Sequence, residues 1–240
     1  MIKKTIDNKN YICDQEAKNW SRELRKPDRY RVWKTANIVK KLKADSLIDI
    51  GCGDGDFLTK IVSLNKLQKV AGSDFSQIRL KNAAKKLNPP AGGKTKNVKL
   101  IHASIEKLPF NNHEFDVVTV LEVLEHIPNL AKAVSEIKRI CRKYLIISVP
   151  SDEKIIYEIC VHCGQPTPRY GHLYSFNQNN LKKIIGKDFK LIKSEKILFK
   201  PFQIVPINNI LPFFLINLID KIANKNNLFN WQIYLFEKNN

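Results

Sequence analysis

Short apolar runs rich in β-branched residues alternate along this chain with segments whose apolar residues recur every three or four positions. The short runs are typical of strands buried on both faces, and the second spacing is typical of amphipathic helices. The runs predict strands at 47–50, 69–74, 98–103, 115–120 and 144–150, and the periodic segments predict helices at 57–67, 76–87 and 129–143. This alternation indicates an α/β fold with a doubly wound, mostly parallel sheet.

The pattern changes after Pro150. The segments 189–199 and 231–238 predict a final antiparallel pair, so we expect a seven-stranded sheet whose last strand is antiparallel. Between them, the insertion 201–230 is strongly apolar, but prolines and asparagines interrupt it, and its uninterrupted part is too short to span a bilayer. It could pack over the sheet, form a lid over an acceptor, or lie on a membrane surface.

Residues 1–45 precede the first predicted strand. Apolar and aromatic residues between positions 14 and 43 predict two helices over the ligand-binding edge of the sheet. We therefore expect an N-terminal helical cap at 1–45 and a single domain at 46–240. The lysines near the start have no apolar run behind them, which excludes a secretory signal and favours a cytoplasmic protein.

A glycine-rich turn follows the first predicted strand and precedes a helix. Gly51, Gly53 and Gly55 would let a ligand lie against bare backbone at the edge where an open α/β sheet binds its ligands. A dinucleotide fingerprint needs a glycine where this chain has Asp56, and Asp54 would also repel a diphosphate. An acidic turn instead favours a ligand with a sulfonium and an ammonium group, which indicates S-adenosylmethionine.

Two further acids belong to this pattern. Asp49 lies in an apolar strand, where its carboxylate needs either the amides of the turn or the amino group of a ligand. Asp74 ends the second strand, the position from which an acid accepts both ribose hydroxyls, and Phe75 beside it could cover the adenine. The alternative is a tight turn with both acids as caps; the order of strand, turn, helix and acid disfavours it.

These residues resemble the class I S-adenosylmethionine-dependent methyltransferases, in particular type 11-like members such as the ubiquinone-biosynthesis O-methyltransferases. The blocks LIDIGCGDG, SDFS and IEKLPFNNHEFDVVTVLEVLEHI follow the order and spacing of that family over about residues 45 to 150. The resemblance implies a Rossmann-like methyltransferase fold. It also implies a cofactor whose methionine part lies at Asp49, Gly51 and Gly53, its ribose at Asp74, its adenine at Phe75 and its sulfonium at the loop of Leu121.

Adenine recognition departs from the family at one position. Where members of this branch usually have an aspartate that accepts from the adenine amino group, this chain has Ser104, whose hydroxyl can still accept. The resemblance implies that the next backbone amide, that of Ile105, meets a ring nitrogen.

His126 is the candidate catalytic residue. Methyl transfer from a sulfonium mainly requires a positioned acceptor, and the imidazole could deprotonate a hydroxyl or an amine, although it could equally cap a helix or lie in the core. On a helix, Glu122, Glu125 and His126 would share one face. Similar triplets bind a divalent ion in the O-methyltransferases named above and, with a later histidine, in enzymes that methylate the 3′-terminal ribose of small RNAs. His172 could be that later ligand for Mg²⁺.

The segment 160–172 contains a second candidate metal site. Cys160 and Cys163 form a Cys-x-x-Cys-Gly pattern, which is common in zinc knuckles, with His172 as the third ligand and His162 or a distant residue as the fourth. The chain has no second complete Cys-x-x-Cys pair, so two reduced thiols are the alternative, and His172 cannot easily serve both metals.

The formal charge of +18 favours nonspecific contact with polyanions such as nucleic acid or anionic membranes. The alternative is a compositional bias toward lysine, carried on solvated faces. We expect methyl transfer to a small-molecule or lipid-linked acceptor at oxygen, by a protein that could be peripheral to a membrane. An RNA methyltransferase and a non-catalytic methyltransferase-like scaffold are the alternatives.

Overall fold

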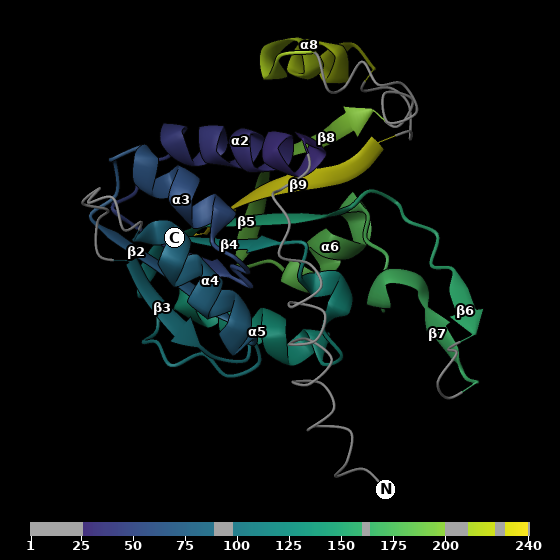
Figure 1. Cartoon of the computed structure of the whole chain (residues 1–240), viewed down its shortest axis with the longest axis horizontal. Coiled ribbons are helices and arrows are strands. Elements are labelled where there is room, and N and C mark those ends of the chain that lie inside the picture. The colour runs from purple at the N-terminus through teal and green to yellow at the C-terminus, as the bar shows by residue number, and fades with distance from the viewer. Residues whose placement is uncertain (1–25, 89–97, 160–163, 200–210, 224–228, 240) are drawn as a thin grey trace, which may run out of the picture.

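A seven-stranded mixed sheet forms the centre of the molecule (Figure 1). The computed structural model describes residues 26–88, 98–159, 164–199, 211–223 and 229–239. The strand order is β3-β2-β1-β4-β5-β9-β8. The bounds are β1 Ser46–Ile50, β2 Lys69–Asp74, β3 Val98–His102, β4 Phe115–Leu121, β5 Cys141–Pro150, β8 Phe189–Phe199 and β9 Phe229–Lys238.

The first five strands pair in parallel, and β9 runs antiparallel to both β5 and β8. The predicted α/β fold, with a doubly wound, mostly parallel sheet and an antiparallel last strand, is therefore confirmed. Parallel strands place their carboxyl ends at one edge, so the loops after β1, β2 and β4 meet there.

Helices cover both faces of the sheet and give it two apolar cores. One face packs against α2 Lys26–Lys41, α3 Asp56–Ser63 and α4 Gln77–Leu87, and the other against α5 Leu130–Ile140 and α6 Gln178–Ile185. In β4, Val118 and Val120 belong to the α5 side, whereas Val117 belongs to the α2 side. Every residue from Phe115 to Val120 is buried, so β4 is covered on both faces and its apolar residues do not alternate with exposed polar ones.

Two helices end earlier than their periodicity predicts, and the first of them, expected at 57–67, ends at Ser63. The helix expected at 129–143 ends at Ile140, and residues 141–143 begin β5 instead. Cys141 is fully buried and pairs with Phe115 of β4, so sheet pairing takes over the end of the helical pattern.

Residues 151–188 contain elements that the sequence did not predict. Strands β6 Tyr157–Ile159 and β7 Pro166–Pro168 form an antiparallel hairpin that projects from the body of the molecule (Figure 1). Every residue of β6 is exposed, so the hairpin has no buried face that could produce a hydrophobic period.

The predicted N-terminal cap is described only in part. Helix α2 packs against β8, β9 and α3 through buried residues that include Tyr30 and Val39, whereas residues 1–25 lie outside the described residues. The division at residue 45 stays a prediction.

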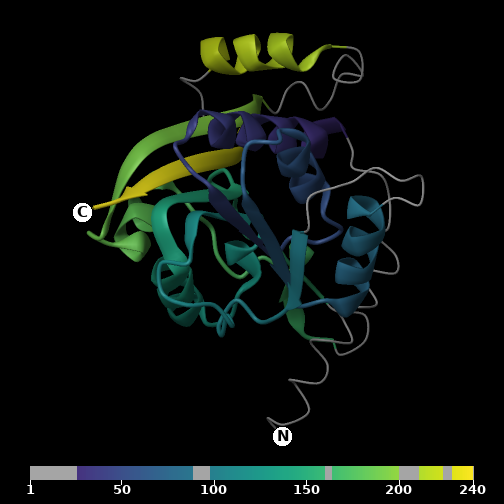
Figure 2. The same cartoon turned by 90° about the vertical axis from the view of Figure 1, so that its left-hand side faces the viewer.

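The apolar insertion at 201–230 contains helix α8 Phe213–Ala223; its residues 201–210 and 224–228 lie outside the described residues. In two perpendicular views, α8 lies outermost, beyond α2 (Figure 1, Figure 2). Among the helices within the described ranges, none has the length and apolar character that crossing a bilayer requires.

Candidate functional site

A cavity of about 300 Å³ opens at the carboxyl ends of β1, β2 and β4. Four of the predicted cofactor residues line it, namely Gly51, Asp74, Phe75 and Ile105, together with the predicted catalytic His126. Asp49, Gly53, Gly55, Ser104 and Leu121 are not among its lining residues, although each of them except Gly55 lies within two positions of one along the chain. Five of the predicted site residues therefore line one cavity, at the edge where sheets of this topology bind ligands.

The turn after β1 depends on its glycines. Gly51, Gly53 and Gly55 all have positive φ angles, of 72°, 52° and 79°. A Cβ atom on Gly51 would lie 2.3 Å from Cγ2 of Val123, so any side chain there would collide with the loop after β4. The backbone amide of Gly51 donates to the carbonyl of Ser73 at 2.7 Å, which holds the turn against the end of β2.

The carboxylate of Asp74 joins two segments of the cavity wall. Its Oδ2 accepts from the amide of Gly53 at 2.8 Å, and its Oδ1 accepts from the amide of Ser76 at 2.8 Å. Each oxygen keeps a lone pair for a further donor, so the carboxylate is held in place while it can still accept from a ligand.

Asp49 lies deeper, with 3% of its surface exposed, and its Oδ1 accepts from the hydroxyl of Thr119 at 2.6 Å. Burial raises the pKa of Asp49 to about 7, with a smaller contribution from Asp74. The hydroxyl of Ser104 accepts from the amide of Glu106 at 3.2 Å and thereby closes the turn that presents the buried Ile105.

The loop after β4 does not form the helix that the triplet hypothesis requires. Glu122 has a φ of 56°, in the left-handed region, and only Leu124–His126 form a short 3₁₀ helix. The side chain of Glu122 instead accepts from Ser148 Oγ and pairs with Arg31 of α2 at 3.0 Å. The prediction that Glu122 shares a helix face with Glu125 and His126 is therefore wrong, because the chain turns at Glu122.

Glu125, His126 and His172 nevertheless come together. One potential ligand atom from each lies within 4.8 Å of the others, and the two imidazole centroids are 4.8 Å apart. Glu125 is fully buried, and neither carboxylate oxygen has a hydrogen-bond partner among the described residues. Burial raises the pKa of this carboxyl to about 7. A buried carboxyl in this state is either protonated or paired with a group from outside the described protein atoms.

His126 is one of the residues that line the cavity. Its Nδ1 lies 3.3 Å from the carbonyl oxygen of Gly171. Desolvation by the surrounding protein, and then the neighbouring His172, lower the pKa of His126 although its ring still reaches solvent. The imidazole is therefore neutral over a wider pH range than a free histidine and can accept a proton.

The segment 169–174 holds His172 over the loop after β4. The amide of Leu173 donates to the carbonyl of Glu125 at 2.6 Å, and the hydroxyl of Tyr174 donates to the carbonyl of Pro128 at 3.0 Å. Nδ1 of His172 also pairs with Glu153. Sequence reasoning missed Arg31 and Glu153, because nothing near either residue along the chain indicates that it reaches this loop.

The predicted zinc knuckle at 160–172 is described only from Gly164 onward. Cys160 and Cys163 lie outside the described residues, and the imidazole of His172 is engaged with Glu153 and stacks edge-on against His126. Zinc at these cysteines stays a prediction.

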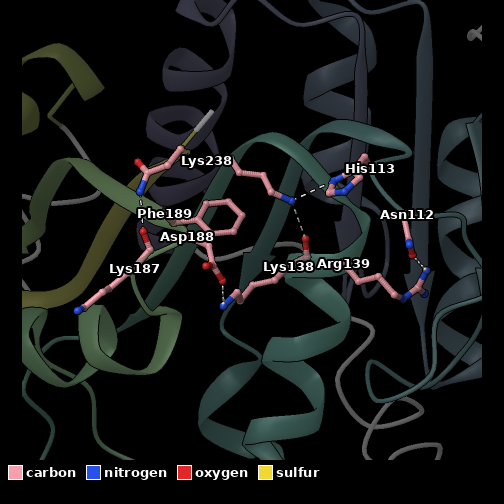
Figure 3. Close-up of a pocket in the computed structure, with 9 residues that line it drawn as sticks. Asn112, His113, Lys138, Arg139, Lys187, Asp188, Phe189 and Lys238 are labelled. Carbon is pink, nitrogen blue, oxygen red and sulfur yellow. Dashed lines mark hydrogen bonds and ion pairs between the residues drawn. The ribbon is translucent and has the colours of Figure 1, made fainter.

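A larger hollow, of about 530 Å³, lies at the opposite edge of the sheet, where β4 and β5 begin (Figure 3). Two of the cationic side chains that line it already have partners: Lys138 pairs with Asp188, and Lys238 donates to the carbonyl of Cys141 at 3.0 Å and contacts His113. The amino ends of parallel strands are not the ligand edge of such a sheet, so we do not place the cofactor there.

Comparison with known proteins agrees with this geometry. Residues 48–147 match a family described as a methyltransferase domain. The chain is similar to the demethylmenaquinone methyltransferase of Staphylococcus aureus, with 29% identity over 188 residues that cover 78% of this chain and 67% of the relative. Residues 48–147 carry a class I S-adenosylmethionine-dependent methyltransferase domain. The matched segment of this methyltransferase runs from β1 to β5 and so contains the turn, the acids and the loop described above.

Solved structures share the fold of the methyltransferase at low identity. The magnesium protoporphyrin IX methyltransferase of Synechocystis PCC 6803, solved with bound S-adenosylmethionine, gives a TM-score of 0.58 at 16% identity over 89% of this chain and 83% of that chain. The small RNA methyltransferase HEN1 gives a TM-score of 0.63 at 22% identity over 89% of this chain and 25% of that chain.

Proposed function

We propose that this methyltransferase transfers the methyl group of S-adenosylmethionine to a hydroxyl oxygen of a small-molecule or lipid-linked acceptor, with His126 beside the acceptor. One observation carries the proposal: His126 lines the same cavity as Gly51, Asp74 and Phe75. His126, which can remove the acceptor's proton, therefore lies beside the residues that we propose bind the cofactor.

In this proposal the cofactor lies along the turn. Asp74 accepts from the ribose hydroxyls with the lone pairs that the amides of Gly53 and Ser76 leave free. Asp49 attracts the ammonium group of the methionine part, which passes over Gly51 and Gly53. The sulfonium then lies near the loop after Leu121, on the side of His126.

The adenine end follows from the same placement. The ring of Phe75 covers one face of the adenine, Ser104 accepts from its amino group, and the amide of Ile105 donates to a ring nitrogen. Nε2 of His102 lies 2.9 Å from the carbonyl of Phe75, which helps to fix this part of the wall.

The proposed reaction is an in-line substitution. The acceptor oxygen attacks the methyl carbon, the bond between carbon and sulfur breaks, and the hydroxyl proton passes to the neutral imidazole of His126. The products are the methyl ether and S-adenosylhomocysteine, and the imidazolium then returns its proton to water. Most of the barrier reduction comes from placing oxygen, methyl carbon and sulfur in line.

Glu125, His126 and His172 form a second candidate for handling the acceptor, because the orphaned carboxylate of Glu125 fits a bound divalent cation. Two imidazoles and one carboxylate suit borderline ions such as Mn²⁺, Fe²⁺ or Zn²⁺ better than Mg²⁺. When bound, such an ion would polarise the acceptor hydroxyl. His126 would then be a ligand rather than the base.

The first experiment tests cofactor and acceptor together. Calorimetric titration with S-adenosylmethionine and S-adenosylhomocysteine, with NAD as the control, is followed by transfer of labelled methyl groups to catechols, lipid-linked phenols and RNA. We expect binding of the first two ligands and methylation of a phenol. Methylation of RNA alone, in a salt-dependent manner, would replace the small-molecule proposal with the RNA alternative.

Two variants separate the roles of the histidine and the metal. His126→Gln lowers turnover with little change in cofactor affinity, whereas His113→Gln, at the opposite edge of the sheet, changes neither. Mn²⁺ or Zn²⁺ raises the melting temperature of the wild type but not that of Glu125→Gln, since ligand binding stabilises the folded state. If the metal raises the melting temperature of Glu125→Gln as much as that of the wild type, Glu125 is not part of an ion site. If His126→Gln keeps full activity, the imidazole is neither the base nor a metal ligand in the reaction.

A further inference from the structure

Helix α8 has an inner face that fixes it to α2. The residues on this face are Phe213, Ile216, Asn217 and Asp220, at the spacing of one side of a helix. Ile216 is 4% exposed, and Oδ2 of Asp220 accepts from the hydroxyl of Tyr30 at 2.9 Å. Nζ of Lys34 donates to Asn217. The helix therefore has a defined orientation, with its opposite side directed away from the molecule.

The outer face of α8 is a row of exposed apolar side chains. Phe214, Leu218 and Ile222, four residues apart, are 64%, 52% and 76% exposed, and Lys221 is exposed on the same side. Figure 1 and Figure 2 both show α8 as the outermost helix, with α2 beneath it. Single exposed apolar residues are ordinary, but three in one row on the outermost helix form a contiguous patch that indicates an interaction surface.

The surface beside this row is strongly basic. A hollow of about 560 Å³ between α2, β8 and α8 is lined by Lys34, Lys40, Lys41, Lys193 and Lys221, and Glu195 is the one acid among its lining residues. Lys40, Lys41, Lys193 and Lys221 are all exposed. An apolar row with lysines along its side complements an anionic lipid surface, since the apolar groups enter the acyl boundary while the lysines meet the headgroups.

We propose that the outer face of α8, with the neighbouring lysines, docks this protein on the surface of a membrane that contains anionic phospholipids. The helix spans 11 residues, so it would lie in the plane of the interface with Phe214, Leu218 and Ile222 inserted. No residue of α8 lines the cavity that contains Gly51, Asp74 and His126, so the docking surface does not depend on which acceptor is methylated.

Flotation of the full-length protein with vesicles tests the proposal. Vesicles of phosphatidylcholine alone are compared with vesicles that also contain phosphatidylglycerol, at low and at high salt. We expect binding to the second kind only, and weaker binding as salt screens the lysines. The triple variant Phe214→Ser, Leu218→Ser, Ile222→Ser should lower the partition coefficient by at least about tenfold, because three inserted apolar side chains are lost.

A control variant removes comparable apolar surface elsewhere. Tyr157→Ser with Ile159→Ser alters the exposed hairpin strand β6, where these side chains are 62% and 66% exposed, and should leave vesicle binding unchanged. Lys221→Glu should weaken binding several-fold. Melting temperature and cofactor affinity, measured on every variant, show that the proteins are folded.

Three outcomes would overturn the proposal: no flotation with anionic vesicles, flotation that the triple variant does not reduce, or equal losses in the triple and control variants. Sedimentation velocity identifies the competing occupant. A dimer that the triple variant converts to a monomer, without vesicle binding by the wild type, would assign the α8 face to a second copy of the chain.

Discussion

Replacing Asp74 with asparagine is the sharpest test of how the cofactor is held. The carboxylate accepts from the amides of Gly53 and Ser76, each at 2.8 Å, and in our proposal it also accepts from two ribose hydroxyls. Asparagine keeps the volume and one acceptor oxygen but puts two donors where the other oxygen was. One ribose hydroxyl and one backbone amide then lose their acceptor.

The size of the effect follows from these contacts. A hydrogen bond to a charged group contributes about 1.5–3 kcal/mol. At about 1.4 kcal/mol for each factor of ten, Asp74→Asn should weaken S-adenosylmethionine binding by about 10- to 150-fold. The unpaired backbone amide should also lower the melting temperature, by about 2–4 °C for each kcal/mol lost in a chain of this size.

Calorimetry with a second ligand shows which part of the cofactor Asp74 contacts. Methylthioadenosine keeps the ribose and lacks the amino acid part, so Asp74→Asn should weaken both ligands by a similar factor. Asp54→Asn removes the same charge from the neighbouring turn after β1, but the carboxylate of Asp54 accepts from Asn82 at 3.1 Å, and binding should stay within about threefold of the wild type. The reasoning is refuted if Asp74→Asn binds methylthioadenosine like the wild type, or if both variants weaken binding equally.

Three further predictions concern the wall of the site. Because burial raises the pKa of Asp49 to about 7 and the ionised form attracts the ammonium group, S-adenosylmethionine affinity should fall as pH drops below about 7 and level off above it. Titrations across this range should show no such trend for methylthioadenosine, which has no ammonium; a shared trend would contradict the assignment. Gly51→Ala should lower the free energy of unfolding by about 1–3 kcal/mol, through its positive φ and its collision with Val123. Thermal denaturation should show partial rescue by Val123→Ala, and a double variant no better than the single one would exclude the steric explanation. Arg31→Met should lower the free energy of unfolding by about 1–3 kcal/mol, because it removes the guanidinium 3.0 Å from the carboxylate of Glu122. Its effect should shrink in a Glu122→Gln background, and denaturant titrations that show additive losses would mean that the ion pair contributes nothing.

The parts of the fold that could be predicted are those set by local pattern. The buried strands are short, largely apolar runs. The glycine turn, with Asp74 at the end of β2, carries enough local chemistry to indicate the cofactor. The helix expected at 129–143 ended early because Cys141 pairs with Phe115, a contact that the helical period of the segment does not contain.

The acceptor side of the site depends on contacts that no local pattern encodes. Glu122 leaves the expected helix face by adopting a positive φ, and its partner Arg31 comes from a helix before β1. His172 meets His126 only because the segment after β7 folds back over the loop after β4. The resemblance suggested His172 as a later ligand, but its pairing with Glu153 required the three-dimensional arrangement.

Within little more than one turn of α2, three side chains point to two different parts of the protein. Tyr30 and Lys34 hold α8, while Arg31 holds Glu122 at the edge of the cofactor cavity. If docking of α8 moves α2, the affinity for S-adenosylmethionine changes by some factor, and thermodynamic linkage then requires that the cofactor change the affinity for the membrane by the same factor. A cell rich in the methyl donor would then hold more, or less, of this enzyme at its membranes than a starved one.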